Sequence, residues 1–320
     1  MIKKSDKIYI AGHRGMVGSS VVKKLKSLGY NNIITRTRSS LDLTDSARVS
    51  RFFEKNSPDV VVLCAAKVGG ILANNTYRGD FIYDNLMISS NIIKSAHDFG
   101  VKKLINLGSS CIYPRDSKIP IKEEYLLTGE LEYTNEPYAI AKIAALKMCE
   151  SFYKQYEDNF YSIMPCNLYG PRDNFDLQTS HVLPALINKI HCAKEKGSSK
   201  VEVWGSGKPL REFLFVEDLA DAVIHCLKNI EAKDIYDLNI SHLNCGSNDE
   251  VSIQDLALFI KSVVEYSGDL SFDSSKPDGT FRKKMDNSRM SNTGFAPKTP
   301  LRLGIQKTYD WFIKKSKDNC

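Results

Sequence analysis

The chain has 320 residues and a mass of 36.0 kDa, which suits about two domains, or one large α/β unit with an appended lobe. Hydrophobic residues make up 42% of the sequence and charged residues 26%, so the composition excludes an intrinsically disordered chain. Lys and Arg outnumber Asp and Glu by 44 to 38, a net charge of +6. This mild excess suits a small anionic substrate and argues against nucleic acid, which usually requires a dense basic stripe.

The sequence also shows little sign of a membrane-spanning segment, a signal peptide or a metal site. The apolar stretch at 8–11 is far shorter than the ~20 residues that span a bilayer and shorter than the core of a signal peptide. We therefore expect a cytoplasmic protein with no membrane partner. The eight cysteines form no CxxC pair and show no zinc or disulfide spacing, so no metal site is predicted. Most should be small buried side chains, with Cys111 as an exception and Cys320 as a free thiol.

The first half of the chain alternates short β-branched runs with longer helical patterns. The predicted strands are 7–11, 32–36, 59–65, 103–107 and 161–167, and the predicted helices are 16–28, 44–56, 80–99 and 136–157. Such alternation with short connections is typical of a parallel sheet covered on both faces. We therefore predict a doubly wound α/β fold and assign residues 1–170 to a first, cofactor-binding domain.

After Gly170 the rhythm changes. Helices are predicted at 181–195, 217–229, 252–265 and 304–315, a strand at 200–205, and further short strand candidates at 212–215, 236–240 and 270–273. The stretch 274–284 is rich in Pro, Gly, Lys and Arg and is predicted to be a loop. We interpret residues 171–320 mainly as a smaller α/β substrate lobe with a discontinuous boundary, because some later segments should return to the first domain. Ligands should bind at the carboxyl ends of the strands.

A glycine-rich turn, GxxGxxG, follows the first predicted strand and opens the first predicted helix. Glycine lets the backbone approach a pyrophosphate, and the helix N-terminus favours its negative charge. In this strand–turn–helix context the spacing predicts a Rossmann-type dinucleotide site. The residues expected to bind the cofactor here are Gly12, Arg14, Gly15, Met16, Val17 and Gly18.

The end of the second predicted strand bears on the choice of cofactor. An acidic residue there would bind the ribose 2′-hydroxyl of NAD(H), but this chain has Arg36 and Arg38. Together with Arg14, these guanidinium groups suit a 2′-phosphate, so the sequence favours NADP(H). The alternative is that all three are solvated surface charges. Asp42 lies a few residues later and is a candidate for the adenine side.

Ser109 follows the fourth predicted strand, and Tyr138 and Lys142 lie four residues apart, on one face of the helix at 136–157. A phenol has a pKa near ~10, and a neighbouring ammonium favours its ionised form. With a serine hydroxyl to hold the oxygen, the three side chains can protonate a carbonyl oxygen during reduction. YxxxK alone is common, but after a glycine turn and a serine-ended strand it predicts a carbonyl reductase.

These motifs together resemble the extended short-chain dehydrogenase/reductases, and among them the GDP-L-fucose synthase family. The similarity continues through AGHRGMVGS, LGSSCIYP, NLYGPRDNF, SHVLPALI, WGSGKPLREFLFVEDLA and SKPDGTFRK and covers almost the whole chain. It implies an NADPH-dependent enzyme that epimerises C3 and C5 of GDP-4-keto-6-deoxy-D-mannose and then reduces the C4 ketone to give GDP-L-fucose. It also implies a homodimer in which helices 80–99 and 136–157 of two subunits form a four-helix bundle.

The resemblance also assigns residue roles. It makes Cys111 the base and His181 the acid of epimerisation, whereas a single cysteine or histidine is by itself more often structural. Asn167 either lines the cofactor crevice or caps its strand, and His13 is expected to be structural. The candidates for binding the sugar nucleotide are Lys189, Trp204, Arg211 and Lys283.

Two alternatives stay open. A related GDP-4-keto-deoxy sugar would lead to GDP-L-colitose or a GDP-deoxyheptose through small changes in the pocket. A non-catalytic NADP-binding protein could use the same fold. The complete set of Ser109, Tyr138 and Lys142 favours an enzyme, because a binding protein has no need of a proton relay.

Overall fold

The apolar strands assemble into one parallel sheet. In the computed structural model, which describes residues 1–276, 278 and 280–317, six strands follow the order β2-β1-β3-β4-β5-β9, all in parallel pairs. They are β1 (Ile8–Ala11), β2 (Ile33–Ile34), β3 (Val60–Leu63), β4 (Lys103–Leu107), β5 (Phe160–Pro165) and β9 (Leu243–Cys245). The strand order reverses between β1 and β3, so the predicted doubly wound α/β fold is confirmed. The predicted free thiol, Cys320, lies outside the described residues.

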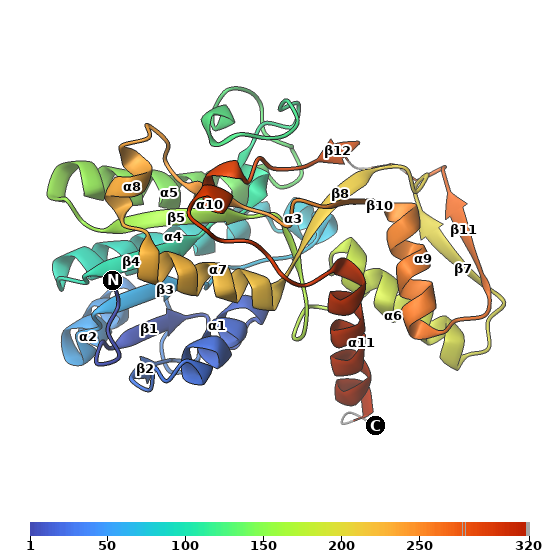
Figure 1. The fold of residues 1–320 in the computed structure, drawn as a ribbon, viewed down its shortest axis with the longest axis horizontal. Coiled ribbons are helices and arrows are strands. Elements are labelled where there is room, and N and C mark those ends of the chain that lie inside the picture. The colour runs from blue at the N-terminus through green and yellow to red at the C-terminus, as the bar shows by residue number, and fades with distance from the viewer. Residues whose placement is uncertain (277, 279, 318–320) are drawn as a thin grey trace.

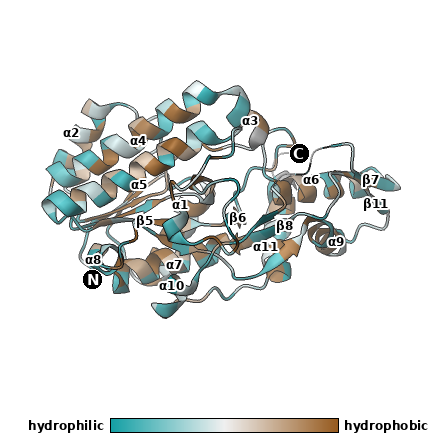
Figure 2. Cartoon of the chain, turned by 90° about the horizontal axis from the view of Figure 1, so that it is seen from above, coloured by the Kyte–Doolittle hydropathy of each residue, from teal (hydrophilic) through white to brown (hydrophobic). Residues whose placement is uncertain are grey.

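Both faces of this sheet are covered, which follows from the period-two pattern of its strands. In β1, Ile8 and Ile10 enter one buried cluster, whereas Tyr9 and Ala11 enter another on the opposite face. The first cluster is covered by α1 (Met16–Ser27), α7 (Val216–Asn229) and α8 (Ala232–Tyr236). The second is covered by α2 (Ser46–Asn56), α4 (Arg78–Asp98) and α5 (Glu136–Tyr156). Figure 2 shows α4 and α5 on one side of the sheet and α7 and α8 on the other.

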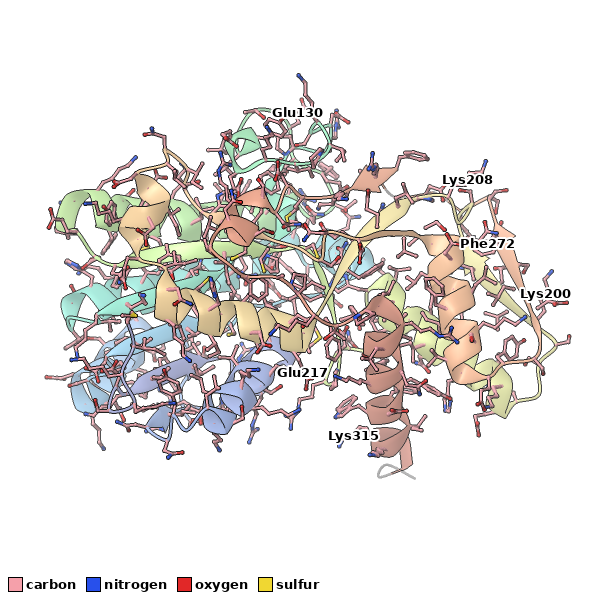
Figure 3. All side chains as sticks on the ribbon, in the orientation of Figure 1. Glu130, Lys200, Lys208, Glu217, Phe272 and Lys315 are labelled. Carbon is pink, nitrogen blue, oxygen red and sulfur yellow. The ribbon has the colours of Figure 1, made fainter. Side chains whose placement is uncertain are left out.

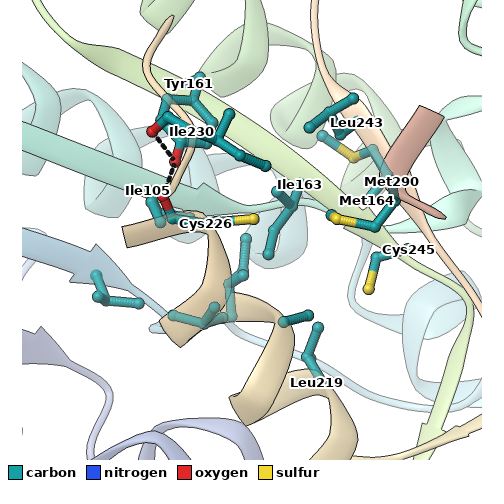
Figure 4. Close-up of a cluster of buried hydrophobic side chains, with 14 of the residues drawn as sticks. Ile105, Tyr161, Ile163, Met164, Leu219, Cys226, Ile230, Leu243, Cys245 and Met290 are labelled. Atoms are coloured by element: carbon teal, nitrogen blue, oxygen red, sulfur yellow. Dashed lines mark hydrogen bonds between the residues drawn. The ribbon is translucent and has the colours of Figure 1, made fainter. Parts of the chain in front are cut away.

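Tyr161 ties a segment from the second half of the chain to this sheet. Its buried hydroxyl donates to the carbonyl oxygens of Cys226 at 3.0 Å and Ile230 at 3.1 Å, as Figure 4 shows. Leu219 and Met164 belong to the same apolar cluster. The end of α7 is thereby held against β5, so α7, like β9, belongs to the large sheet although it follows residue 170.

A smaller lobe lies beside the large sheet (Figure 1). It contains a four-stranded sheet of β6 (Asn167–Tyr169), β8 (Leu210–Phe215), β10 (Glu250–Ser252) and β12 (Arg282–Lys283), and a pair of β7 (Lys200–Trp204) with β11 (Asp269–Asp273). Its helices are α6 (Val182–Glu195), α9 (Ile253–Val264) and α11 (Leu301–Lys317). They share one apolar core, while charged side chains such as Lys200, Lys208 and Lys315 extend outward (Figure 3).

Short elements complete the fold. They are α3 (Ile71–Thr76), α10 (Ser288–Asn292) and the 3₁₀ turns η1 (Ser110–Ile112) and η2 (Glu123–Tyr125). None of these was predicted from the sequence. Each is only one or two turns long, and a segment of that length shows too little hydrophobic periodicity to be distinguished from a loop.

Three sequence predictions need correction. The strand predicted at 161–167 is two strands, because β5 ends at Pro165 and β6 begins at Asn167 in the other sheet. The run 236–240 is not a strand, because Tyr236 ends helix α8, Asp237 keeps a helical backbone and Asn239 has a left-handed φ of 56°. The loop predicted at 274–284 ends in strand β12, which pairs with β8.

Membrane and metal features are absent from the part of the chain that the structure describes. None of its helices is long and apolar enough to cross a bilayer, and no group of three His, Cys, Asp or Glu side chains could hold a metal ion. The cysteines there are free thiols. Cys149, Cys166, Cys226 and Cys245 are buried, and Cys64, Cys111 and Cys192 keep some exposure. The buried four therefore act as small core side chains.

Candidate active site

The glycine turn forms a cradle of main chain between β1 and α1. Gly12 has a φ of +85°, and a Cβ there would lie 2.7 Å from the amide nitrogen of Ala65. A Cβ on Gly18 would lie 2.3 Å from the carbonyl oxygen of Gly12, so α1 can approach the turn only with glycine at this position. Gly15 caps α1 without a side-chain hydrogen bond, which leaves the first N–H groups of the helix available to a phosphate. The turn therefore fits a dinucleotide cofactor.

The predicted cofactor arginines lie at the surface beside this turn. Arg14, Arg36 and Arg38 are all exposed. The Arg36 guanidinium lies over the Phe52 ring, 5.3 Å from its centroid, and donates to its neighbour's carbonyl oxygen at 2.8 Å. These two contacts keep the Arg36 guanidinium near the end of β2, where the 2′-phosphate of a bound cofactor would lie.

Asp42 is already used by the turn that leads into α2. Its Oδ1 accepts hydrogen bonds from the Thr44 amide at 3.0 Å and from the Thr44 hydroxyl at 2.8 Å. These two bonds lower the pKa of the Asp42 carboxyl below its ordinary value. Asp42 therefore shapes the loop that follows β2, and its contact with an adenine stays a prediction.

Ser109, Tyr138 and Lys142 come together at the carboxyl end of β4. Ser109 caps η1, with its hydroxyl accepting from the Cys111 amide at 3.4 Å, and its side chain also hydrogen-bonds to Tyr138. The Lys142 ammonium donates to the Leu107 carbonyl at 2.9 Å and lies 5.7 Å from the centroid of the Tyr138 ring. The end of β4 and one face of α5 thus bring the three predicted side chains into one site.

Burial dominates the electrostatics of these three residues. It raises the pKa of the Tyr138 phenol well above its ordinary value, and the hydrogen bond from Ser109 opposes that shift. Burial also lowers the pKa of Lys142 to about 8, against the opposite effect of the Cys111 and Cys64 thiols. A lysine with a pKa near neutrality and a buried phenol are groups that can pass a proton to a substrate oxygen.

A small cleft opens beside this trio. Cys111 lies in its wall with Lys283, and other lining residues include Tyr113, Glu132 and Asn135. Burial raises the pKa of the Cys111 thiol, while the positive charge of Lys283 lowers it. The same burial lowers the pKa of Lys283. A thiol and an ammonium therefore share one desolvated space, where each favours the charged form of the other.

Lys283 reaches this cleft because β12 pairs in parallel with β8, with Lys283 opposite Arg211. The Arg211 guanidinium donates to the Leu210 carbonyl at 2.8 Å, and burial lowers its pKa. On the neighbouring helix, Lys189 lies over the Trp204 ring at 5.6 Å from its centroid, and Trp204 itself is 67% exposed. The four predicted substrate residues thus fall into two pairs within the smaller lobe.

His181 occupies the N-cap of α6. It is not among the described residues that line the Cys111 cleft. Its side chain keeps an exposed surface, yet the surrounding chain withdraws part of it from water, which lowers its pKa. The loop before it is tied to the segment after β3 by a bond from the Gly70 amide to the Thr179 carbonyl at 2.8 Å. This bond holds the main chain two residues before His181 against the segment that follows β3.

Sequence reasoning missed the residues that hold the Cys111 segment in place. The Tyr113 hydroxyl is hydrogen-bonded to His242 at 2.6 Å and to Asn244 at 2.5 Å, and all three side chains are buried. Tyr113 stands two residues after Cys111, a signal that the turn is anchored, but its partners are distant in sequence. Asn167, by contrast, donates its amide to the Glu212 carbonyl at 3.0 Å and so joins β6 to β8.

Comparison with known proteins places these features in a wider group. Residues 8–246 match the NAD dependent epimerase/dehydratase family. A protein named GDP-L-fucose synthase 1 from Arabidopsis thaliana is 52% identical over 314 residues, covering 98% of this chain and 95% of that protein. A protein named GDP-L-colitose synthase from Yersinia pseudotuberculosis is 37% identical over 314 residues, covering 98% and 100%. The solved structure of MlghC, a GDP-mannoheptose C4 reductase from Campylobacter jejuni with NADP bound, superposes with a TM-score of 0.91 at 40% identity, covering 98% and 100%.

Proposed function

The chain belongs to the NAD dependent epimerase/dehydratase family, and on that premise we propose that it converts GDP-4-keto-6-deoxy-D-mannose into GDP-L-fucose. The reaction epimerises C3 and C5 and then reduces the C4 ketone. The observation that carries this proposal is the cleft in which Cys111 and Lys283 lie beside Ser109, Tyr138 and Lys142. A simple reductase needs the last three residues but has no use for a thiol held against an ammonium.

Epimerisation uses the acidity that the C4 ketone gives to its neighbouring carbons. In this proposal the Cys111 thiolate removes the proton from C3 or C5, and Lys283 stabilises that thiolate. Ser109 and Tyr138 donate hydrogen bonds to the ketone oxygen as it gains negative charge in the enolate. His181 then returns a proton to the opposite face of the carbon, and inversion is complete.

Reduction uses the same oxygen-binding groups. NADPH, when bound, supplies the hydride that C4 receives. The Tyr138 hydroxyl gives its proton to the C4 oxygen, and the Lys142 ammonium beside the phenol stabilises the phenolate that remains. Ser109 keeps the oxygen in place throughout. One site can therefore perform both reactions, because each begins with stabilisation of the same oxygen.

The nicotinamide cofactor fits the main-chain cradle, and we propose NADP(H) rather than NAD(H). The residues that would hold its pyrophosphate are Gly12, Gly15, Met16, Val17 and Gly18. Arg14, Arg36 and Arg38 would bind the 2′-phosphate. All three are exposed, Arg14 in the glycine turn and Arg36 and Arg38 after β2, which supports this assignment. Asp42 would approach the adenine.

The smaller lobe provides the groups suited to the GDP end of the substrate. Arg211 and Lys283 bring two positive charges together, which suits the negative charge of a diphosphate. The exposed Trp204 ring offers a flat apolar face, with Lys189 above it. We accordingly assign residues 1–170 mainly to the cofactor and residues 171–320 mainly to the GDP-sugar.

GDP-L-colitose or GDP-heptose chemistry is the related alternative. It is less well supported, because the colitose enzyme and the heptose reductase are 37% and 40% identical to this chain, compared with 52% for the fucose enzyme. A purely NADP-binding role would leave the hydrogen-bonded Ser109, Tyr138 and Lys142 without a task.

We also propose a homodimer formed through α4 and α5. The two helices pack side by side on one face of the sheet, and their outer surface includes Tyr83, which is 60% exposed, and Ile140, which is 41% exposed. Apolar side chains on neighbouring helices favour a helix-bundle interface. Light scattering should return twice the 36.0 kDa of one chain, and a monomer mass would refute the dimer.

One experiment tests the proposed function. The purified protein is mixed with NADPH and GDP-4-keto-6-deoxy-D-mannose, the loss of NADPH absorbance is followed, and the product is identified by NMR. We expect stoichiometric oxidation and GDP-L-fucose. Oxidation that yields GDP-D-rhamnose, the C4-reduced sugar without inversion, would refute the epimerase step, and no oxidation would refute the whole proposal.

A further inference from the structure

A completely buried carboxylate lies in the middle of the smaller lobe's sheet. Glu212, on β8, has 0% of its surface exposed. Its Oε1 accepts hydrogen bonds from the Asn248 amide at 2.9 Å and the Asn287 side-chain amide at 3.0 Å. Its Oε2 accepts from the Met285 amide at 3.0 Å. All three partners are N–H donors, so both oxygens must act as acceptors, as they do in an ionised carboxylate.

The surroundings of Glu212 are shaped to admit it. A Cβ on Gly246 would lie 2.2 Å from its Oε1, so the chain can pass at this distance only with glycine. Burial raises the pKa of the Glu212 carboxyl, and the three N–H donors oppose that effect. A buried carboxylate costs free energy unless its hydrogen bonds are satisfied, so Glu212 and its three donors must stay together in the folded protein.

The bonds of Glu212 fix the strand that carries Lys283. Strand β12 is only two residues long, and the Met285 amide bound by Glu212 lies two residues beyond Lys283. On the other side of the strand, the Leu210 amide donates to the Phe281 carbonyl at 2.9 Å. Lys283 is therefore held between two anchors, one of which is the Glu212 side chain. Its place in the sheet sets its distance to Cys111 and to Arg211.

A second carboxylate on the same sheet offers a contrast. Glu250 stands opposite Glu212 in the β8–β10 register. It also contacts β12, where it accepts from Arg282 at 2.8 and 2.6 Å, but the Arg282 side chain is 45% exposed. That pair lies at the surface and is screened by solvent. Glu250 is thus the same residue type and also contacts β12. Its side chain is 12% exposed rather than completely buried, and it binds the Arg282 side chain rather than a main-chain amide beyond the strand.

We propose that Glu212 is a positioning residue for the sugar-nucleotide cleft, holding β12 so that Lys283 stays beside Cys111 and Arg211. This inference rests on the proposed function for its kinetic consequences, but the placement of Lys283 against Cys111 can be measured without turnover. Glu212 touches neither substrate nor cofactor in this proposal. It acts through the main chain of the strand next to it.

Glu212→Gln tests the proposal, with Glu250→Gln as the matched control. The amide is nearly isosteric, but its NH₂ must face an N–H donor, so at least one bond to β12 or its neighbours is lost. We expect the KM for the GDP-sugar to rise about tenfold and the KM for NADPH to stay within about twofold. Glu250→Gln should change both by less than about twofold.

Alkylation of Cys111 by iodoacetamide, quantified on its peptide by mass spectrometry, gives the measurement that is independent of activity. In Glu212→Gln the pH at half-maximal alkylation should rise by about half a unit to one unit, because the ammonium of Lys283 moves away from the thiol. Amide exchange across residues 281–287 should become faster in that variant only. Unchanged alkylation and exchange together with an unchanged GDP-sugar KM would overturn the proposal.

The test still decides the role of Glu212 if the variant does not fold or if the wild-type protein does not turn over the GDP-sugar. If Glu212→Gln fails to fold, Asn287→Ala removes one of the three bonds, and about a threefold rise in GDP-sugar KM with a smaller shift of Cys111 alkylation is expected. No shift in that variant would refute the positioning role. If the wild-type protein does not turn over the GDP-sugar, the proposed function fails, while Cys111 alkylation and amide exchange still decide the role of Glu212.

Discussion

The cofactor cradle and the sugar cleft are built in opposite ways. The cradle consists of consecutive residues, from Gly12 to Gly18, and its shape comes from the main chain. The cleft brings Cys111 and Lys283 together, and strand register places Arg211 opposite Lys283, although the three residues come from distant parts of the sequence. The cradle's arginines are exposed, whereas burial shifts the pKa of each of the three cleft groups.

The difference shows how binding and chemistry are divided in this molecule. A main-chain cradle binds a phosphate without a need to tune any titratable group. A cleft that moves protons needs groups whose charge can change near neutral pH. Burial brings the pKa of Lys142 toward that range, whereas for Cys111 burial raises the pKa and the positive charge of Lys283 opposes it. Substitutions in the cradle should therefore affect cofactor binding, and substitutions in the cleft should affect GDP-sugar binding and proton transfer while leaving cofactor binding nearly unchanged.

The largest expected effect tests the cleft. Cys111→Ser replaces a thiol by a hydroxyl that does not ionise near neutral pH, so the exchange of C3 and C5 protons with deuterated water should fall about 10²–10⁴-fold. The KM for NADPH should stay within about twofold. NMR of the sugar measures the exchange. Cys192→Ser, at a half-buried thiol on α6, is the control. Unchanged exchange in Cys111→Ser would remove the thiol from the reaction.

The next effect tests the cradle. In Gly18→Ala the new Cβ would meet the Gly12 carbonyl oxygen at 2.3 Å, so the turn must move, and NADPH affinity should fall about 100-fold. Fluorescence titration of NADPH measures the affinity. Gly79→Ala, where a Cβ meets nothing within 4 Å, is the control and should bind normally. Cys111 alkylation should be the same in both variants. If Gly18→Ala altered the thiol as strongly as the cofactor, the separation of the two regions would be wrong.

A smaller effect concerns the choice of cofactor. Replacing Arg36 and Arg38 together by Ala should reduce the preference for NADPH over NADH about tenfold, or about 1.4 kcal/mol. The ratio of kcat/KM for the two cofactors measures it, with Arg51→Ala on α2 as a control at another exposed arginine. A wild-type enzyme that uses both cofactors equally would show that these arginines have no part in the selection.

The smallest effect concerns pH. Because burial lowers the pKa of Lys142 to about 8, its ammonium is lost above that pH. At about half a pH unit above this pKa, kcat/KM should be about fourfold lower than its maximum at lower pH. Lys142→Arg keeps its charge, so this decline of kcat/KM at high pH should disappear, although the overall rate falls. The unfolded chain binds the Lys142 proton more tightly than the folded chain does, so the free energy of unfolding should rise between about pH 8 and about pH 10. A pH profile that is identical in Lys142→Arg would assign the decline to another group.

The sequence was most informative where structure depends on neighbouring residues. The glycine turn and the strand at 103–107 lie where they were predicted, because period-two and glycine patterns are local signals. The split of the strand at 161–167 was missed, since only one residue separates β5 from β6 and the change of sheet depends on distant pairing partners. The position of Lys283 was also beyond sequence reasoning, because it depends on the pairing of β12 with β8 and on Glu212, and neither partner is adjacent in the chain.

Cys166 alone separates the two sheets, since β5 ends at Pro165 and β6 begins at Asn167. Its amide donates to the Cys245 carbonyl at 3.1 Å, and its side chain is 7% exposed. A hinge needs residues that are free to change φ and ψ, and this link has no such freedom. The lobes are therefore joined as a stiff frame at this point. We therefore expect any opening during turnover to involve surface loops rather than a swing of the lobes about this link.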